Sequence, residues 1–156
     1  AAERLLLDLA DLFRAALSGP REIALADELS LARRYLEIES LRFGERLRVH
    51  WRLPDELPDV LVPTLSIQPL VENAIRHGVE PSVTGGTIEI DVDVSPTRVR
   101  IIIANDLPRS GAIATSGHRV GLASARARIR ALSRERGDLE AGIEDGRFVA
   151  TITLPR

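Results

Sequence analysis

The chain has 156 residues, a formal net charge of −2, 44% hydrophobic and 28% charged residues, and neither cysteine nor methionine. This balance is typical of one soluble globular domain, and no apolar run approaches the roughly 18 residues that a membrane-spanning helix needs. The lack of cysteine excludes disulfides, thiolate nucleophiles and cysteine-based zinc sites, and His50, His77 and His118 lie too far apart for the usual spacing of a metal site.

Residues 3–17 form the first predicted element, an amphipathic helix. Leucine recurs there at the three- and four-residue spacing of one helical face, and Ser18-Gly19-Pro20 ends the pattern. A single compact domain offers this helix little to pack against, so we interpret it as the end of a helical bundle or dimer interface; the alternative is simple docking on the domain. The chain begins Ala1-Ala2-Glu3 without a methionine, from which we expect a longer parent protein.

A second helix is predicted over residues 26–43, with apolar residues on two faces and Gly44 as its C-cap. The period of the pattern then changes to two over residues 47–52, which predicts a strand. A proline-rich loop follows the strand. Thr64 or Ser66, at the end of that loop, is placed to cap the next helix.

The stretch QPLVENAIRHG, residues 68–78, predicts a third helix, and one stripe of this helix is unusually polar. Pro69, Asn73, Arg76 and His77 fall on that stripe, beside the apolar positions that pack inward. Asparagine is unfavourable inside a helix because its amide competes for backbone hydrogen bonds. A satisfied buried amide or a solvated helix face would explain the stripe structurally, and a binding site would explain it functionally.

Two hairpins and one more helix complete the predicted order. We expect strands over residues 87–94, 98–104, 139–143 and 148–154, a loop over 105–117 and a helix over 120–136. Helices, then strands, then a helix and strands again predict an α+β fold. The predicted fold is a two-layer sandwich with helices on one face of a mixed sheet.

Three of these elements together carry the residue types of a nucleotide site. Asn73 offers an amide oxygen to Mg²⁺, which takes few protein oxygens beside water and phosphate, and Arg76 suits a phosphate oxygen. Asn105 or Asp106, at a strand end, is placed to accept a hydrogen bond from an adenine amino group. The sequence Gly117-His118-Arg119-Val120-Gly121-Leu122 opens a helix, where backbone N–H groups and the helix dipole favour phosphates.

In this order and spacing the three elements resemble the N, G1 and G2 boxes of the GHKL, or Bergerat, ATP-binding fold. The chain is most similar to sensor histidine kinases of the LytS type, particularly the AlgZ-like branch, and the resemblance covers nearly its whole length. It is carried by LARRYLEIESLRFGERL (residues 31–47), VPTLSIQPLVENAIRHG (62–78) and VGLASARARIRAL (120–132). The resemblance implies a GHKL α/β sandwich over residues 20–156, preceded over 1–19 by the end of the dimerisation and phosphotransfer region.

The resemblance also implies a role for individual residues, with ATP and Mg²⁺ as cofactors. Asn73 would be the Mg²⁺ ligand, and Arg76 and His77 would lie near the phosphates. Glu72 lies roughly 100° from Asn73 around the helix; it would either act as a base that orients the attacking histidine or make a structural hydrogen bond. The remaining implied ATP contacts are Asn105, Asp106, Gly117, Arg119, Gly121 and Leu122.

Two features depart from the family pattern. The usual Asp-x-Gly-x-Gly sequence of the G1 box appears as Asn105-Asp106-Leu107-Pro108-Arg109, without glycine and with asparagine in place of the adenine-reading aspartate. An asparagine carbonyl still accepts a hydrogen bond but lacks the charge that strengthens it. The phosphoacceptor motif Pro-His-Phe-Leu-Phe-Asn is absent, so we expect the phosphorylated histidine on a helix upstream of this chain.

By this resemblance the chain presents ATP·Mg²⁺ for autophosphorylation of the upstream histidine in a two-component sensor kinase. Its implied partners are the histidine-bearing helix of the same protein, a second copy of the parent protein in a homodimer, and a LytTR-type response regulator. The chain would be the cytoplasmic domain of an inner-membrane protein. Rapid ATP hydrolysis is not expected, because Pro69 stands where hydrolysing relatives have a water-activating glutamate.

Two other functions are weighed against this one. A degenerate GHKL interaction module would no longer bind ATP and would act by docking partners, and the altered G1 box is the feature that favours it. Nucleic-acid binding would rest on the arginines of residues 126–136, but the net charge of −2 argues against it. Nucleotide binding separates the kinase domain from the interaction module.

Overall fold

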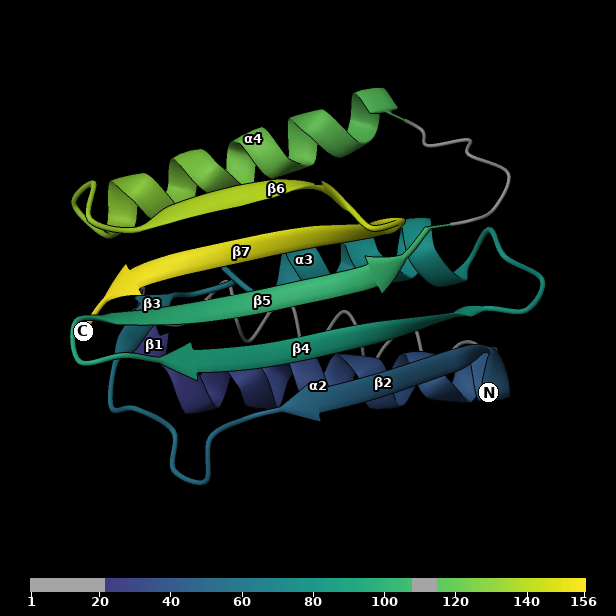
Figure 1. Ribbon diagram of the computed structural model, residues 1–156, viewed down its shortest axis with the longest axis horizontal. Helices are drawn as coiled ribbons and strands as arrows, with labels where there is room; N and C mark the ends of the chain where they lie inside the picture. Colours follow the sequence, from purple (N-terminus) through teal and green to yellow (C-terminus); the bar gives the residue numbers. More distant parts are fainter. Residues whose placement is uncertain (1–21, 108–114) are drawn as a thin grey trace.

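The computed structural model describes residues 22–107 and 115–156, with residues 115–121 described by their backbone alone (Figure 1). Its strands are β1 (Glu22–Ala24), β2 (Leu47–Arg52), β3 (Leu61–Pro63), β4 (Gly86–Val94), β5 (Arg98–Asp106), β6 (Asp138–Glu144) and β7 (Arg147–Pro155). Five of them form a mixed sheet in the order β2-β4-β5-β7-β6, and β1 pairs with β3 in a separate two-stranded sheet. β2 runs parallel to β4, and the other neighbours in the large sheet are antiparallel.

The helices form a second layer on one face of this sheet. They are α2 (Leu25–Phe43), α3 (Gln68–Ala74) and α4 (Thr115–Leu132), with a 3-10 turn η1 (Gly44–Arg46) and a π-helical turn η2 (Ile75–Val79). Figure 1 shows α2 and α3 behind the sheet and α4 along its β6 edge. No helix of the described residues is long and apolar enough to cross a membrane. The predicted α+β sandwich with a mixed sheet is confirmed.

The core lies between the two layers because each strand alternates its side chains. Ile88 and Ile90 of β4 and Ile101 of β5 are fully buried against the helices. Ile67, just before α3, and Ile129 of α4 join the same buried cluster. The sheet therefore supports α3 and α4 from one side and sets the distance between them.

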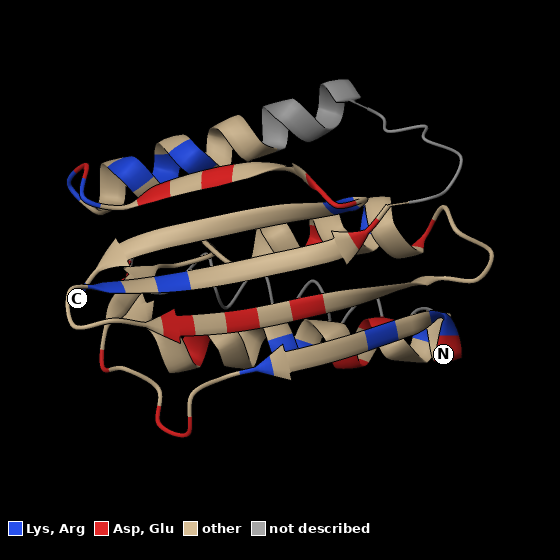
Figure 2. Cartoon of the chain, in the orientation of Figure 1, with Lys and Arg blue, Asp and Glu red and all other residues tan. Residues whose placement is uncertain are grey.

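The opposite face of the sheet is charged, and no described helix covers it. Figure 2 shows acidic residues along β4 and basic residues on the flanking strands β2 and β5. Arg147 of β7 bonds to Glu89 (Nη1 to Oε2, 3.2 Å) and lies 3.6 Å from the carboxylate of Asp106. Such cross-strand pairs favour one register of the strands over its alternatives.

Several predicted boundaries were wrong. β5 continues to Asp106, so Asn105 and Asp106 belong to the strand and not to the predicted loop. α4 begins and ends earlier than predicted; its C-terminal end is set by Arg134 and Glu135, which take left-handed φ values of 56° and 64°. The short strands β1 and β3 were not predicted. The helix predicted over residues 3–17 and the domain boundary after residue 19 lie outside the described residues.

Candidate functional site

The start of α3 is fixed by a residue from another helix. Thr64 or Ser66 was predicted to cap α3, but the N-cap residue is Ile67, which makes no side-chain cap hydrogen bond, and the Oγ of Ser66 has no hydrogen-bond partner. Instead, the carboxylate of Glu28 on α2 accepts hydrogen bonds from the backbone N–H groups of Leu65 (3.2 Å) and Ile67 (3.1 Å). Ser66 therefore does not cap α3, and the acceptor at the start of α3 comes from a residue far away in the sequence.

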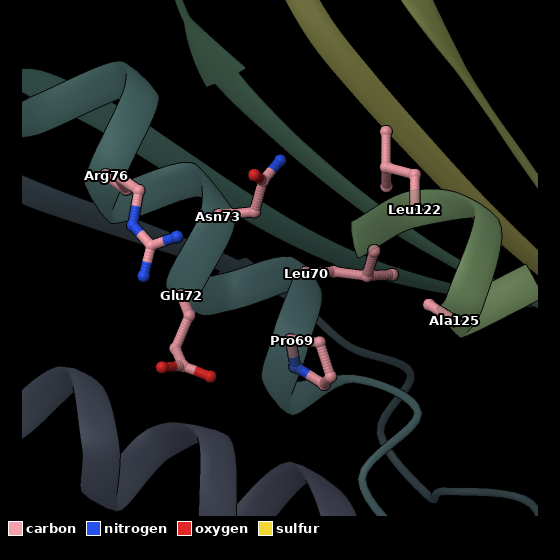
Figure 3. Close-up of a pocket in the computed structure, with 7 residues that line it drawn as sticks. All are labelled: Pro69, Leu70, Glu72, Asn73, Arg76, Leu122 and Ala125. Carbon is pink, nitrogen blue, oxygen red and sulfur yellow. The ribbon is translucent and has the colours of Figure 1, made fainter. Parts of the chain in front are cut away.

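A cavity of about 170 Å³ lies between α3 and α4 (Figure 3). It is lined by Pro69, Leu70, Glu72, Asn73, Arg76, Leu122 and Ala125. In Figure 3, Leu70 points across the cavity toward α4, and Asn73 projects from the same helix one turn further on. The structure thus brings together four residues that the sequence analysis singled out for the site: Glu72, Asn73, Arg76 and Leu122.

Glu72 and Asn73 are neighbours in the sequence but extend from different sides of α3. Figure 3 shows the Glu72 carboxylate pointing toward α2, while the amide of Asn73 points away from that helix. Burial raises the pKa of Glu72; the guanidinium of Arg76 opposes this shift and the carboxylate of Glu39 adds to it. The surroundings of Glu72 therefore favour its protonated form more than water does.

Arg76 and His77 lie on η2, which continues α3 as a wider, π-helical turn. Such turns are rare and occur frequently at functional sites. Arg76 is exposed at the cavity and His77 is half-buried. Burial lowers the pKa of His77, as does the adjacent Arg76 cation, whereas Glu80 acts in the opposite direction. The imidazole is therefore mainly uncharged at neutral pH.

Asn105 and Asp106 point to opposite faces of the sheet, since they are consecutive residues of β5. Asn105 is 2% exposed on the helix side, where its Nδ2 donates to the main-chain carbonyl of Asp106 at 2.9 Å. Gly78 of η2 packs directly on the Asn105 side chain. Asp106 lies on the charged face, where Oδ2 accepts a hydrogen bond from the Thr87 N–H at 3.1 Å. Of the two residues proposed to read adenine, Asn105 is the one on the side of the cavity.

The three remaining predicted positions belong to the first turns of α4. The helix begins at Thr115, so Gly117 lies in its first turn, and Arg119 and Gly121 follow in the next turn. Their side chains lie outside the described part of the chain. Leu122 is the first residue of α4 with a described side chain, and it lines the cavity.

The sequence analysis missed two residues of α2 that interact with Glu72. Tyr35 and Glu39 are both buried, and each interacts electrostatically with the Glu72 carboxylate. Burial raises the pKa of the Tyr35 hydroxyl above its usual range, and the carboxylates of Glu39 and Glu72 act in the same direction. Their spacing of four residues was the available signal, because it places both side chains on one face of a helix.

Replacing Glu72 with glutamine is expected to stabilise the fold at pH 8, by at most on the order of 1 kcal/mol, or about 2–4 °C in Tm. The pKa of Glu72 is higher in the folded than in the unfolded chain. The native state is therefore most stable when the carboxyl is protonated, and it loses stability as the pH rises through the folded pKa. Glutamine does not titrate in this range. The stability gain of Glu72→Gln over the parent chain should therefore shrink as the pH falls toward 5.

Thermal melts of the parent chain and Glu72→Gln between pH 5 and 8 measure this difference. Asp27→Asn, the same chemical change at an exposed position of α2, is the control and should show no such trend. An advantage of Glu72→Gln that stays constant across the pH range would contradict the assignment to the carboxyl group.

Known proteins resemble this chain in sequence. A family model described as histidine kinase matches residues 1–47. The chain is 41% identical over 108 residues to the sensor histidine kinase/phosphatase LytS of Staphylococcus aureus, and 35% identical over 107 residues to the sensor protein LytS of Staphylococcus epidermidis. Each alignment covers 67% of this chain and 18% of the relative, so the chain corresponds to a small part of those proteins.

Solved structures resemble it in fold. The catalytic domain of the histidine kinase ThkA has a TM-score of 0.67 at 20% identity, covering 86% of this chain and 95% of that chain. The Acinetobacter baumannii histidine kinase AdeS has a TM-score of 0.62 at 18% identity, covering 97% and 79%. ThkA in complex with the response regulator TrrA has a TM-score of 0.57 at 17% identity, covering 98% and 48%. The predicted GHKL fold is thereby confirmed.

Proposed function

The chain is a relative of the LytS-type sensor histidine kinases with the fold of a histidine kinase catalytic domain, and from this premise we propose that it binds ATP with Mg²⁺ and presents the γ-phosphate to a histidine elsewhere in the parent protein. One observation carries the proposal: Asn73 and Arg76 line a single cavity between α3 and α4. An amide oxygen and a guanidinium in one cavity match the two needs of a metal-bound triphosphate. The parent would be a protein histidine kinase.

The described residues fit Mg²⁺ at Asn73 rather than a site made wholly of protein ligands. No cluster of three or more histidine, cysteine, aspartate or glutamate side chains in the described ranges is placed to hold a metal. Mg²⁺ commonly takes one or two protein oxygens and completes its shell with water and phosphate. When bound, it would neutralise charge on the phosphate oxygens. Asn73 would supply its amide oxygen, and Arg76 would contact a phosphate.

The adenine would be read by Asn105 in this proposal. The bond from Nδ2 to the main-chain carbonyl of Asp106 supports one orientation of the amide, in which Oδ1 is the acceptor end. An acceptor matches the amino group of adenine. Gly117, Arg119 and Gly121 would complete the phosphate side from α4, and His77 would lie beside the phosphates as a neutral donor.

Glu72 and Pro69 bear on the fate of the γ-phosphate. Because Glu72 points toward α2 (Figure 3), its orientation supports a structural role more than direct contact with the attacking histidine. Pro69, one turn before Asn73, has no group that activates water. We therefore propose slow hydrolysis, with ATP kept for transfer to the histidine.

The proposal extends to partners. The histidine kinase ThkA has been solved with a response regulator, and we propose a response regulator, of the LytTR type, as the phosphate acceptor here. The histidine-bearing helix and a second subunit would come from the parent protein, an inner-membrane protein with this domain in the cytoplasm. Nucleic acid is not proposed as a partner, because Arg126 is paired with Asp138 (2.8 Å) and Arg130 with Glu135 (3.0 Å).

Calorimetric titration of this chain with ATP and ADP, with and without Mg²⁺, tests the proposal. We expect binding of both nucleotides, with affinity for ATP enhanced at least about tenfold by Mg²⁺, equivalent to about 1.4 kcal/mol. A folded chain that binds neither nucleotide would overturn the proposal and favour the interaction module. GTP serves as the control for base recognition and should bind more weakly.

A further inference from the structure

Glu28 is a buried charged residue for which the nucleotide site has no direct use. It lies in the first turn of α2 and is 0% exposed. Burying a carboxylate is costly unless hydrogen bonds and opposite charges compensate it. The compensation here comes from another element, since Oε2 and Oε1 accept the N–H groups of Leu65 and Ile67.

This one carboxylate accounts for the backbone donors at the start of α3. The first N–H groups of a helix have no partner within the helix. Besides those of Leu65 and Ile67, the backbone N–H of Gln68 also donates a hydrogen bond to the Glu28 carboxylate. The next residue, Pro69, has no N–H group that needs an acceptor. The N-cap residue Ile67 makes no side-chain cap of its own. α3 therefore begins where Glu28 holds the chain.

The turn that leads into α3 is strained, and Glu28 is one of the groups that hold it. Leu65 takes a left-handed conformation with φ of 63°, which costs a non-glycine residue roughly 1–2 kcal/mol. The Oγ of Ser66 and both amide atoms of Gln68 are buried without a hydrogen-bond partner. The two hydrogen bonds that the Glu28 carboxylate accepts from this segment therefore oppose the strain at Leu65.

Glu28 is also linked to the other wall of the cavity. Burial raises its pKa, while the three backbone N–H groups and the guanidinium of Arg128 on α4 oppose that shift. Arg128 of α4 therefore stabilises the charged form of Glu28, and the Glu28 carboxylate in turn binds the backbone at the start of α3. The cavity lies between these same two helices.

We propose that Glu28 is a positioning residue for nucleotide binding: its two hydrogen bonds hold Leu65 in its left-handed turn and so set where α3 begins, which places Asn73 and Arg76 in the cavity. Its link to nucleotide affinity rests on the proposed function. The effect of Glu28 on the geometry of α3 does not rest on the proposed function, and amide hydrogen exchange measures it separately.

The test compares Glu28→Gln with its exposed neighbour, Asp27→Asn. Glutamine keeps the size of the side chain but loses the charge and turns one acceptor into a donor that faces backbone N–H groups. We expect about tenfold weaker binding of ATP·Mg²⁺ for Glu28→Gln, measured at a temperature where circular dichroism shows it fully folded. Asp27→Asn should bind as the parent chain does.

Leu65→Gly provides the rescue that a merely structural role would not give. Glycine adopts the left-handed turn without strain, so the turn no longer depends on the carboxylate. In the Leu65→Gly background, Glu28→Gln should therefore weaken binding by only about twofold to threefold, because the two residues act on one feature. An equal loss in both backgrounds, or unchanged binding by folded Glu28→Gln, would overturn the proposal.

Amide exchange separates this inference from the proposed function. If the parent chain fails to bind ATP, the proposed function fails, but the N–H groups of Leu65 and Ile67 still report on the turn. Their protection should be lost in Glu28→Gln and kept in Asp27→Asn. Protection that persists in Glu28→Gln would overturn the positioning role whatever the outcome of the nucleotide titration.

Discussion

Replacing Asn73 with alanine is expected to remove the Mg²⁺-dependent part of ATP affinity while leaving the fold in place. The side chain is half-buried and lines the cavity, and alanine is a better helix former than asparagine, so the helix itself should persist. We expect a loss of on the order of tenfold or more in the affinity for ATP·Mg²⁺. Affinity for ATP without Mg²⁺ should change much less. Calorimetric titration of both forms of the nucleotide measures the difference.

Asn73→Asp is the matched variant, because a carboxylate keeps an oxygen for the metal. It should retain the enhancement by Mg²⁺ that Asn73→Ala loses. If Asn73→Ala binds with the same Mg²⁺ dependence as the parent chain, the metal does not lie at Asn73. Melting temperatures of both variants show whether each is folded under the conditions of the titration.

Replacing Gly78 with alanine is expected to damage both the fold and the nucleotide site. A Cβ atom at Gly78 would lie 2.6 Å from Nδ2 and 2.9 Å from Cβ of Asn105. Asn105 is short and buried, so the clash has to move the backbone of η2 or β5. Overpacking of this kind typically costs about 1–3 kcal/mol, and it displaces the residue proposed to read adenine. Thermal unfolding and ATP titration measure the two effects.

Gly142→Ala is the control for this prediction. Gly142 is exposed on β6, and nothing lies within 4 Å of a Cβ built there. The same substitution should therefore leave both the stability and the nucleotide affinity close to those of the parent chain. At a helix position without close neighbours, alanine is more stable than glycine by about 1 kcal/mol. If Gly78→Ala were more stable than the parent chain, the close approach to Asn105 would not constrain η2.

Local patterns predicted the larger elements well. The helix expected over residues 26–43 is α2, and the two expected hairpins are β4 with β5 and β6 with β7. The ends of these elements differ from the predicted ends by about two residues or fewer. These elements have a clear period and a short turn beside them, so each is specified by residues close in the sequence. The strands β1 and β3 are too short to show a period, and no short turn joins them, because they pair segments far apart in the chain.

The site was predicted in part for the same reason. Asn73 and Arg76 belong to one predicted helix, residues 68–78, and their spacing placed them together before the fold was known. Asn105 and Asp106 were left as alternatives, and only the pairing of β5 within the sheet shows that Asp106 faces the charged side with Thr87. Glu28 and Gly78 were missed, since their contacts join residues that no local pattern connects.

The parallel pairing of β2 with β4 has a consequence for the order of folding. The hairpins β4–β5 and β6–β7 close through short turns, whereas β2 reaches β4 only after a crossover, residues 53–85, that contains α3. Long-range contacts of this kind form late, because the chain loses the entropy of the loop before it gains the contacts. Because α3 lies within this crossover, we expect the cavity between α3 and α4 to take shape near the end of folding. A nucleotide bound in it would slow unfolding and leave the folding rate almost unchanged.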